Sequence, residues 1–412
     1  MSKEIYVYEE FFSRTPALLG TLYIETVRGG EHCAFEYDRA WLRASRPQAF
    51  LDPNLAYYNG RQYPPNSGFG IFADSAPDRW GRVLMDRRER LNAAREGRKP
   101  RRLLESDYLL GVYDEVRMGA LRFKAEKEGA FLSDDTGTAV PPWTTLRTLE
   151  EAARNFESEE TTLEEKWLAQ LIKPGSSLGG ARPKATVLAP DGSMWIAKFP
   201  SRNDDCNVGA WEAVAHRLAA LCGLCVPQSK LEAFSKYGST FLVKRFDREG
   251  AQRIHFASAM TLLGKTDGAD ASDGSGYLDM VSFIRANGAA PESDLRELWR
   301  RIVFSMAITN TDDHLRNHGF LLTRAGWRLS PLYDVNPVPY GDTLSLNVDE
   351  TSNEISLPLA VSAAKYFGID KATAEKTAEE ITETVKRNWE RLAAEAGIRR
   401  GGIELMRPAF ME

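Results

Sequence analysis

Two aspartates and one asparagine in the last third of the sequence have the types and the spacing that phosphoryl transfer needs. Asp312 and Asn317 lie five positions apart in TDDHLRN (311–317), and Asp334 follows seventeen positions later, after a strand-like run. In kinases one Asp orients the attacking hydroxyl, while an Asn and a second Asp hold Mg²⁺ against the phosphates. Because Mg²⁺ completes its shell with water and phosphate oxygens, two protein ligands suffice. Taken alone, the same residues could simply cap a loop, since Asp and Asn are common in turns.

A lysine in an apolar strand strengthens the case for chemistry. Lys198 lies within WIAKF (195–199), where a charged side chain is costly unless it is paired or used. This placement fits a lysine that binds the phosphates of ATP. Glu212, in the next expected helix, is either the ion-pair partner of Lys198 or part of a solvated helix face.

A loop of small residues at 176–184 precedes this strand. Gly179 and Gly180 lack side chains, so the backbone there could approach phosphates closely. The loop follows neither the Walker A nor the GxGxxG pattern, and as a motif it is weak. The segment KRFDR (244–248) follows the next hairpin and would lie beside the adenine. We therefore predict a phosphate-covering loop and an adenine-contacting crossing segment.

Hydrophobic periodicity predicts the elements that must position these residues. Strands are expected at 18–26, 33–37, 119–123, 185–188, 194–199, 231–234, 240–246, 320–322 and 327–329, and helices at 77–95, 148–158, 162–172, 208–221, 277–286, 293–309, 357–366 and 371–397. In the helix at 77–95, Pro77 suits the first turn, and Trp80, Val83 and Leu84 share one face. Arginines crowd the other face, which is either a solvated surface or a partner-binding surface.

The order of these elements is that of a kinase with two lobes. A loop, a strand with a lysine, a helix with a glutamate and a hairpin precede a helical region that carries the Asp and Asn residues. We therefore predict an α+β, bilobal fold of the protein-kinase or phosphoinositide-kinase type. The expected domains are an accessory N-terminal subdomain at 1–125, a mixed α/β N-lobe at 126–247 and a mostly helical C-lobe at 248–412.

Composition limits the classes of protein and partner. The 412 residues are 43% hydrophobic and 27% charged, and the formal net charge of −5 argues against coating nucleic acid by bulk electrostatics. No run reaches the ~18–20 apolar residues that span a bilayer. The N-terminal MSKEIYVYEEFF lacks the apolar core of a secretory signal. Four cysteines in so long a chain indicate a reducing compartment, so we expect a cytoplasmic protein without membrane contact.

The cysteine pair CGLC (222–225) has the spacing that metal and redox sites use. A zinc site would need two further ligands, and the sequence contains no second CxxC and no close CxxH. The pair also lies where an amphipathic helix ends at Gly223 and meets Pro227. This position favours small buried residues at a helix end.

Six segments in one order resemble the HipA family, the serine/threonine kinase toxins of bacterial toxin–antitoxin pairs. They are GALRF (119–123), SLGGARPK (177–184), IAKF (196–199), VKRFDR (243–248), NTDDHLRN (310–317) and LYDV (332–335), and DRWGR (78–82) is similar to the family's accessory domain. Each motif alone has modest specificity, and together they are strong. The Asp-x-His-x-x-Asn pattern is also shared with phosphoinositide-type kinases.

The resemblance implies ATP and Mg²⁺ as cofactors and a role for individual residues. Asp312 matches the catalytic aspartate, Asn317 and Asp334 match the Mg²⁺ ligands, and Lys198 matches the phosphate-binding lysine. Ser177 falls where the family phosphorylates its own loop and silences the kinase, because a phosphate there would compete with the nucleotide. Pattern and resemblance together predict nucleotide-binding residues at Ser177, Gly179, Gly180, Ala181, Lys184, Lys198, Phe246, Asp247 and His314.

The resemblance also implies partners. The family is held by a HipB-type helix-turn-helix antitoxin, which would be the chain's link to DNA, and its related toxins phosphorylate an aminoacyl-tRNA synthetase. Two residues depart from the family pattern. Lys244 stands where an acidic residue is common, so the adenine would contact the backbone there, and Asp313 adds a charge beside Asp312. A structural role is favoured for His314, His216, His255 and His318, although His314 could orient its loop.

Three functions stay open from the sequence. The chain is an active protein kinase toxin, a pseudokinase-like corepressor subunit that binds a DNA-binding antitoxin, or a kinase of a small molecule or lipid. The expected polar residues are present at positions 198, 312, 317 and 334, which argues against a pure binding role. The lack of a basic membrane-surface patch weighs against lipids.

Overall fold

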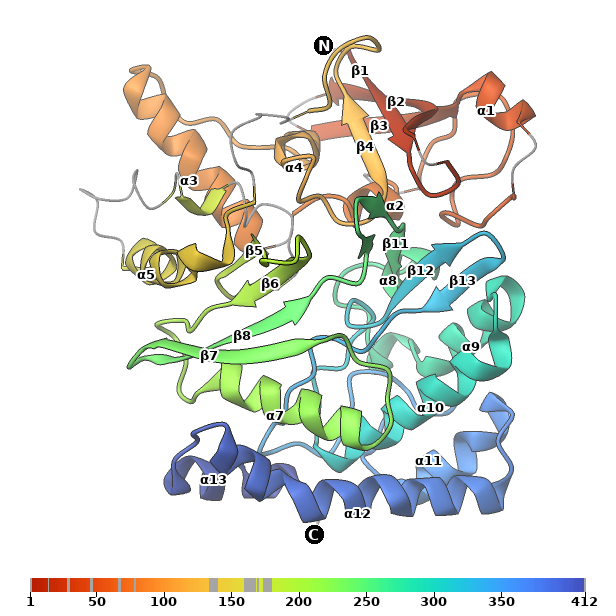
Figure 1. Cartoon of the computed structure of the whole chain (residues 1–412). Helices are drawn as coiled ribbons and strands as arrows, with labels where there is room; N and C mark the ends of the chain where they lie inside the picture. The colour runs from red at the N-terminus through yellow and green to blue at the C-terminus, as the bar shows by residue number, and fades with distance from the viewer. Residues whose placement is uncertain are drawn as a thin grey trace. The chain divides into compact units, whose positions relative to one another are not determined.

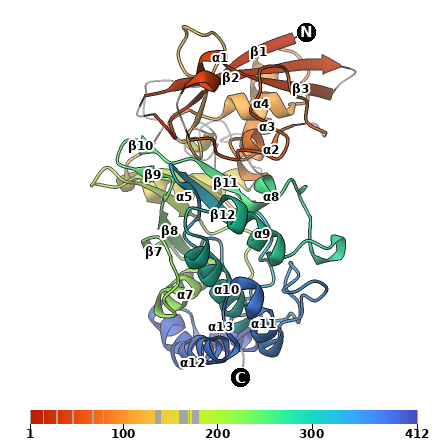
Figure 2. The same ribbon diagram turned by 90° about the vertical axis from the view of Figure 1, so that its right-hand side faces the viewer.

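The chain forms two compact units, which we call the first and the second unit. The structure is a computed structural model that describes residues 2–13, 15–27, 30–44, 47–65, 68–77, 79–132, 140–158, 168, 170–172 and 180–410. The first unit is Met1–Asn203 with Lys244–Ala257, and the second is Asp204–Val243 with Ser258–Glu412. Figures 1 and 2 show the elements of each unit.

A four-stranded antiparallel sheet opens the first unit, in the order β3-β2-β1-β4 (Figure 1). Its strands are β1 (Ser2–Glu9), β2 (Ala17–Val27), β3 (Gly30–Tyr37) and β4 (Leu121–Lys124). The predicted hairpin of β2 and β3 is confirmed, with Gly20 opposite Tyr37. Gly20 is required there, because a Cβ would lie 2.2 Å from the carbonyl oxygen of Glu36. The strand β1 was not predicted, although Ile5 and Val7 alternate into the core.

The helices of the first unit are α1 (Arg39–Arg43), α2 (Gly70–Ala73), α3 (Arg79–Arg95), α4 (Glu105–Gly111) and α5 (Leu146–Phe156). In α3 the predicted burial of Trp80 and Leu84 is confirmed, whereas Val83 is 45% exposed and its placement on the same face was wrong. At about 100° per residue the buried arc runs from Trp80 through Leu84 to Met85, and Val83 falls outside it. The expected helix at 162–172 lies largely outside the described residues.

Two hairpins complete the first unit, as far as its described residues show. The predicted hairpin at 185–199 is confirmed as β5 (Lys184–Leu188) and β6 (Met194–Lys198), which pair antiparallel. β9 (Arg248–Glu249) and β10 (Gln252–Arg253) form a second, short hairpin. The strand β11 (Phe256–Ser258) begins near the end of the segment Lys244–Ala257.

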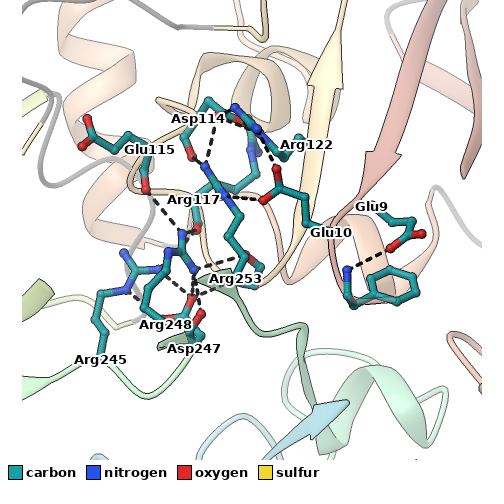
Figure 3. Close-up of polar contacts among 12 residues, drawn as sticks. Glu9, Glu10, Asp114, Glu115, Arg117, Arg122, Arg245, Asp247, Arg248 and Arg253 are labelled. Carbon is teal, nitrogen blue, oxygen red and sulfur yellow. Dashed lines mark hydrogen bonds and ion pairs between the residues drawn. The ribbon is translucent and has the colours of Figure 1, made fainter. Parts of the chain in front are cut away.

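A buried carboxylate fixes the segment at 244–253 within the first unit (Figure 3). Asp247 is 1% exposed and accepts hydrogen bonds from Nε and Nη2 of Arg245, at 2.9 and 2.7 Å, and from Nη1 of Arg248, at 2.7 Å. The backbone N–H of Gly119 donates to the same carboxylate at 2.8 Å. Burial would raise the pKa of Asp247, but Arg245 and Arg248 hold that pKa well below its usual range.

The same arginines reach the turn that leads into β4. Arg245 donates to the carbonyl oxygens of Val116 and Arg117, and Arg248 donates to those of Arg117 and Gly119. A second cluster lies nearby, where Arg122 and Arg253 meet Asp114 and Glu10 (Figure 3). The segment at 244–253 is therefore attached to the N-terminal sheet region by charge-assisted hydrogen bonds, which are about twice as strong as neutral ones.

The second unit is mainly helical. Its helices are α7 (Val208–Leu221), α8 (Ala259–Leu262), α9 (Tyr277–Asn287), α10 (Pro291–Ala307), α11 (Leu357–Ala363), α12 (Lys371–Glu395) and α13 (Arg400–Met406), and its strands are β7 (Ser229–Ser235), β8 (Gly238–Lys244), β12 (Gly319–Thr323) and β13 (Gly326–Leu329). Short 3-10 helices lie at Trp143–Thr145 in the first unit and at Ala271–Asp273, Ala364–Phe367 and Arg407–Ala409 in the second.

Three long helices form the core of the second unit, where α12 packs against α7 and α10 (Figures 1 and 2). Pro291 occupies the first turn of α10, and apolar residues from Leu298 to Ala307 are buried around the helix. The long predicted helices and the two strands predicted at 320–322 and 327–329 are confirmed, and these strands pair as β12 and β13, whereas α13 was not predicted. The loop that carries Asp312 follows the helix α10.

The cysteine pair lies at the end of α7, as predicted. Gly223 has φ +72°, the left-handed conformation that ends many helices. Cys222 is buried and Cys225 is exposed, and both are free thiols, so the prediction of burial holds for one of them. Burial raises the pKa of Cys222 to about 12. Among the described residues, no helix is both long and apolar enough to cross a bilayer.

We predict that Asp247→Ala lowers the free energy of unfolding by about 3–5 kcal/mol, because it leaves two buried guanidinium groups without their counter-charge. Chemical unfolding would measure the loss. The matched control is Glu249→Ala, which removes an exposed carboxylate two residues away and should change stability by less than about 0.5 kcal/mol. Equal effects of the two substitutions would contradict the role of Asp247.

His255 predicts a pH dependence of stability. It is fully buried, stacks on Phe11 at 5.0 Å between ring centroids, and burial lowers its pKa to about 3. The neutral ring therefore contributes stability that is complete above the ordinary pKa of about 6.5 and is lost as the pH falls from there towards 3.

The expected loss between pH 7.5 and pH 5.5 is about 1 kcal/mol from this residue. Urea unfolding of the wild type and of His255→Phe at both pH values measures it. The variant keeps an aromatic ring against Phe11 but cannot titrate, so its pH dependence should be weaker by that amount. An identical pH dependence in both proteins would show that His255 does not titrate on unfolding.

Candidate active site

The predicted catalytic loop lies in the second unit, between α10 and β12. Thr309, just after α10, has φ +49°, and Asp334, after β13, has φ +55°. Among the described residues these are the two non-glycine positions with positive φ. Asp tolerates this conformation, but it strains a β-branched Thr. Strained positions of this kind cluster at functional sites, because the surrounding structure must hold them.

Asp312 points outward and lies near Asp334. Its side chain is 81% exposed. Partial desolvation raises its pKa, Nε2 of His314 at 4.0 Å opposes that shift, and the nearby carboxylates of Asp334 and Asp313 add to it. Two of the three predicted residues are therefore close enough to interact electrostatically, and an exposed carboxylate with a raised pKa is suited to accept a proton.

Asn317 is buried beside Asp312. Its Nδ2 donates to the backbone carbonyl oxygen of Asp312 at 2.7 Å, and its backbone N–H donates to that of His314 at 2.8 Å. The first bond orients the amide and leaves Oδ1 as an acceptor. The oxygens of Asn317 and Asp334 are the kind of donor that Mg²⁺ prefers, and a cation would relieve the repulsion between Asp334 and Asp312.

The donor set fits Mg²⁺ better than a metal held by protein alone. No group of three or more His, Cys, Asp or Glu residues that could hold a metal ion occurs in the part of the chain that the structure describes. Zinc sites usually use three or four such ligands, whereas Mg²⁺ commonly keeps water and phosphate oxygens in its shell. Asn317 and Asp334 stay the predicted ligands.

His314 flanks Asp312 on the same loop. Its Nδ1 is buried and has no hydrogen-bond partner among the described residues. A buried ring nitrogen without a partner costs free energy, so a ligand or water near this atom would stabilise the loop. The prediction that His314 contacts the nucleotide stays a prediction.

Asp313 takes a place that sequence reasoning missed. Asp313 adds its charge beside Asp312, as expected, but the sequence did not show that its side chain is 4% exposed and lies against His318, with Nε2 2.9 Å from Oδ1. His318, for which no partner was visible in the sequence, therefore has one. The sequence does contain a signal for this pair. A charged residue and a histidine lie on the same loop, and a buried strand begins directly after the histidine.

Two lysines of the first unit share one face of the β5–β6 hairpin. Lys184 lies directly opposite Lys198 in the antiparallel register, so their side chains point to the same side. Lys184 is buried, and its Nζ lies 2.5 Å from where a Cβ of Gly180 would be. This register places two basic side chains next to each other on one face of the hairpin.

The described end of the predicted phosphate loop is held by the helix α3. The backbone N–H of Trp80 donates to the carbonyl oxygen of Gly180 at 3.3 Å, and its Nε1 donates to that of Lys184 at 3.0 Å. Ala181 lies between these two bonds. The sequence placed Trp80 on the apolar face of the expected helix and did not predict this role. Ser177 and Gly179, and with them the predicted autophosphorylation site, lie outside the described residues, as does Asp78.

The predicted adenine segment lies in the first unit. Phe246 is half-buried and its ring lies 6.1 Å from that of Phe256. The carboxylate of Asp247 is occupied by Arg245, Arg248 and Gly119, so any contact of Asp247 with a nucleotide would use its backbone. In the second unit Glu212 is 3% exposed, which makes the solvated helix face wrong for this residue.

Comparisons with known proteins show which family the chain resembles. The sequence profile of the HipA-like C-terminal domain matches residues 176–389, just over half of the chain. A putative kinase of Sinorhizobium fredii, Y4dM, is 30% identical over 218 residues, which cover 48% of this chain and 52% of that protein. A putative kinase of Haemophilus influenzae is 27% identical over 212 residues, 46% of this chain and 60% of that protein. The chain thus spans about half to three fifths of the length of these relatives.

A solved structure confirms the fold. HipA in the Shewanella oneidensis MR-1 complex of HipA, HipB and operator DNA matches with a TM-score of 0.67 at 16% identity, over 98% of this chain and 94% of that one. At this identity the likeness shows a shared fold, and the predicted α+β, kinase-like fold class is confirmed. With the profile match at 176–389, the resemblance found in the sequence is confirmed as well: the chain belongs to the HipA-like family.

Proposed function

We propose that this chain is an ATP- and Mg²⁺-dependent kinase that transfers the γ-phosphoryl group to a serine or threonine hydroxyl of a protein. The observation that carries the proposal is the site in the second unit, where an exposed aspartate with a raised pKa, a neighbouring aspartate and an oriented asparagine meet. Family membership supports it, and the relatives from Sinorhizobium fredii and Haemophilus influenzae are named putative kinases.

In this mechanism Asp312 accepts a hydrogen bond from the attacking hydroxyl and takes its proton as the new P–O bond forms, while the bond from the γ-phosphorus to the β–γ bridging oxygen breaks and ADP leaves. Its exposure gives a protein substrate access, and its raised pKa makes it a better proton acceptor than an ordinary carboxylate. Asn317 Oδ1 and the carboxylate of Asp334 would hold Mg²⁺. Bound Mg-ATP supplies the transferable phosphoryl group and the counter-charge for the transition state.

The first unit supplies phosphate contacts in this proposal. Lys198 binds the phosphates of ATP, with Lys184 beside it on the same face of the hairpin. The loop at 176–184 covers the phosphates, and Ser177 is the site at which the kinase phosphorylates and silences itself. Phe246 and the backbone of Asp247 contact the adenine.

The biological role that we propose is that of the toxin in a toxin–antitoxin pair. The chain would be held by a HipB-type antitoxin, contact DNA through that antitoxin and phosphorylate a translation-related protein such as an aminoacyl-tRNA synthetase. The support is the fold shared with HipA, which in the Shewanella structure assembles with HipB and operator DNA.

We predict that Asp312→Asn lowers the rate of phosphoryl transfer about 10²–10⁴-fold, the contribution typical of a general base. The measurement is incubation with Mg-ATP, followed by intact mass and peptide mapping, in which the wild type gains a phosphate at Ser177. The variant keeps the shape of the side chain and should still bind ATP. Asp342→Asn, an exposed aspartate elsewhere in the second unit, is the control and should react like the wild type.

Two results would count against this proposal. If Asp312→Asn reacts as fast as the wild type, Asp312 is not the base. If the wild type binds ATP but phosphorylates neither itself nor a supplied synthetase, the corepressor function, in which the chain only binds an antitoxin, becomes the better explanation.

A second substitution tests the phosphate contact. Lys198→Met removes an ammonium group from the hairpin, so we expect a higher KM for ATP and weaker binding of the nucleotide, measured by calorimetry. The control is Lys230→Met on β7 in the second unit, which should leave ATP affinity unchanged. Equal affinities of Lys198→Met and the wild type would remove Lys198 from the site.

A further inference from the structure

Asp312 and Asp313 are neighbours in the chain with opposite surroundings. The side chain of Asp312 is 81% exposed, and that of Asp313 is 4% exposed. Adjacent residues share a peptide plane, so an anchor that fixes the side chain of one restricts the direction of the other. The direction in which Asp312 points therefore depends on what holds Asp313.

Groups from three elements hold the carboxylate of Asp313. The hydroxyl of Tyr277, at the start of α9, donates to Oδ2 at 2.6 Å, and the hydroxyl of Ser305, in α10, donates to the same oxygen at 3.3 Å. His318, just before β12, lies 2.9 Å from Oδ1. Burial would raise the pKa of Asp313, but His318 and the two hydroxyls hold it below its usual value. The carboxylate is thus a buried charge with its full set of partners.

The same network continues to the loop that carries Asp334. Ser305 Oγ accepts from Nδ2 of Asn310 at 3.3 Å. Oδ1 of Asn310 in turn accepts from the backbone N–H of Asn336 at 3.4 Å, two residues after Asp334. A chain of hydrogen bonds therefore connects the buried carboxylate with both loops of the candidate site. Hydrogen bonds in such a chain polarise and strengthen one another.

We infer that Asp313 is a positioning residue that holds the loops of Asp312 and Asp334 in register. This rests on the proposed function, because register matters only if the two carboxylates act on one substrate. Misplacing reacting groups by about 1 Å can cost about 100-fold in rate without weakening substrate binding. Asp313 itself is too deeply buried to touch a substrate, and it acts through its neighbours.

The test uses two substitutions in the full chain. Asp313→Asn removes the charge and keeps the shape, and Tyr277→Phe removes one buried hydroxyl only. We expect kcat to fall about 100-fold for the first and about 10-fold for the second, with KM for ATP unchanged. Tyr366→Phe, which removes a hydroxyl bonded to Glu350 at the surface, is the matched control and should change neither constant.

Hydrogen exchange read by mass spectrometry gives a second readout that does not need catalysis. Both variants should exchange faster in peptides covering 309–318 and 331–338, with no change in α12, which contributes no residue to this network. A global loss of stability would instead raise exchange in α12 as well. The comparison between peptides keeps the test valid even if Asp313→Asn is less stable. Tyr277→Phe leaves the charge of Asp313 in place and gives an independent variant.

Three results would overturn the inference. They are an unchanged kcat in both variants, a raised KM for ATP with an unchanged kcat, or exchange that stays as in the wild type at 331–338. If the wild type itself shows no phosphoryl transfer to any acceptor, the proposed function fails, and the exchange pattern alone still decides whether Asp313 ties the two loops together.

Discussion

A buried charge must be matched by its surroundings, and each unit of this chain contains a buried carboxylate, Asp247 in the first and Asp313 in the second, whose partners show how. Removing a carboxylate from water costs several kcal/mol even after the protein relaxes, so it persists only with charged partners and directed hydrogen bonds. In the first unit Asp247 collects Arg245, Arg248 and the N–H of Gly119. In the second unit Asp313 collects Tyr277, Ser305 and His318.

The hydrogen bonds around Asp247 connect the segment at 244–253 with the N-terminal part of the chain. Arg245 and Arg248 donate to carbonyl oxygens between residues 115 and 119, and these residues lead directly into β4. The first unit thus joins residues that the sequence analysis assigned to different domains. Trp80 adds a second tie, because it binds the backbone at Gly180 and Lys184.

The sequence predicted the features that depend on local pattern. The helices α7, α9, α10 and α12 and the hairpins β2–β3, β5–β6, β7–β8 and β12–β13 have strong periodicity or a turn signal between strands, and they were found within a few residues of their bounds. The strand β1 was not predicted, because the alternating apolar residues at the N-terminus were compared only with the pattern of a signal peptide. Val83 was placed on the wrong face because three apolar residues within one and a half helical turns do not show to which side of them the buried face extends.

Contacts between distant residues were beyond reach of the same reasoning. Asp313 reaches Tyr277 across 36 positions and Asp247 reaches Gly119 across 128, and no local pattern encodes either bond. Glu212 could not be assigned to a buried or a solvated face, because the helix α7 is apolar around most of its surface and only packing decides. The candidate site depends on particular residue types at a fixed spacing, which the sequence does show, and the roles assigned to these residues stay predictions.

The adjacent pair of aspartates shows how one fold gives two identical side chains different chemistry. Asp313 has a lowered pKa and stays ionised as an anchor, because a histidine and two hydroxyls stabilise its charge. Asp312 has a raised pKa, because desolvation and two nearby carboxylates disfavour its charge, and it remains exposed. A proton acceptor and a fixed support need these opposite properties. The buried partner network therefore does more than stabilise the second unit: it lowers the pKa of Asp313 and keeps that side chain from solvent, whereas Asp312 stays exposed, as its proposed role requires.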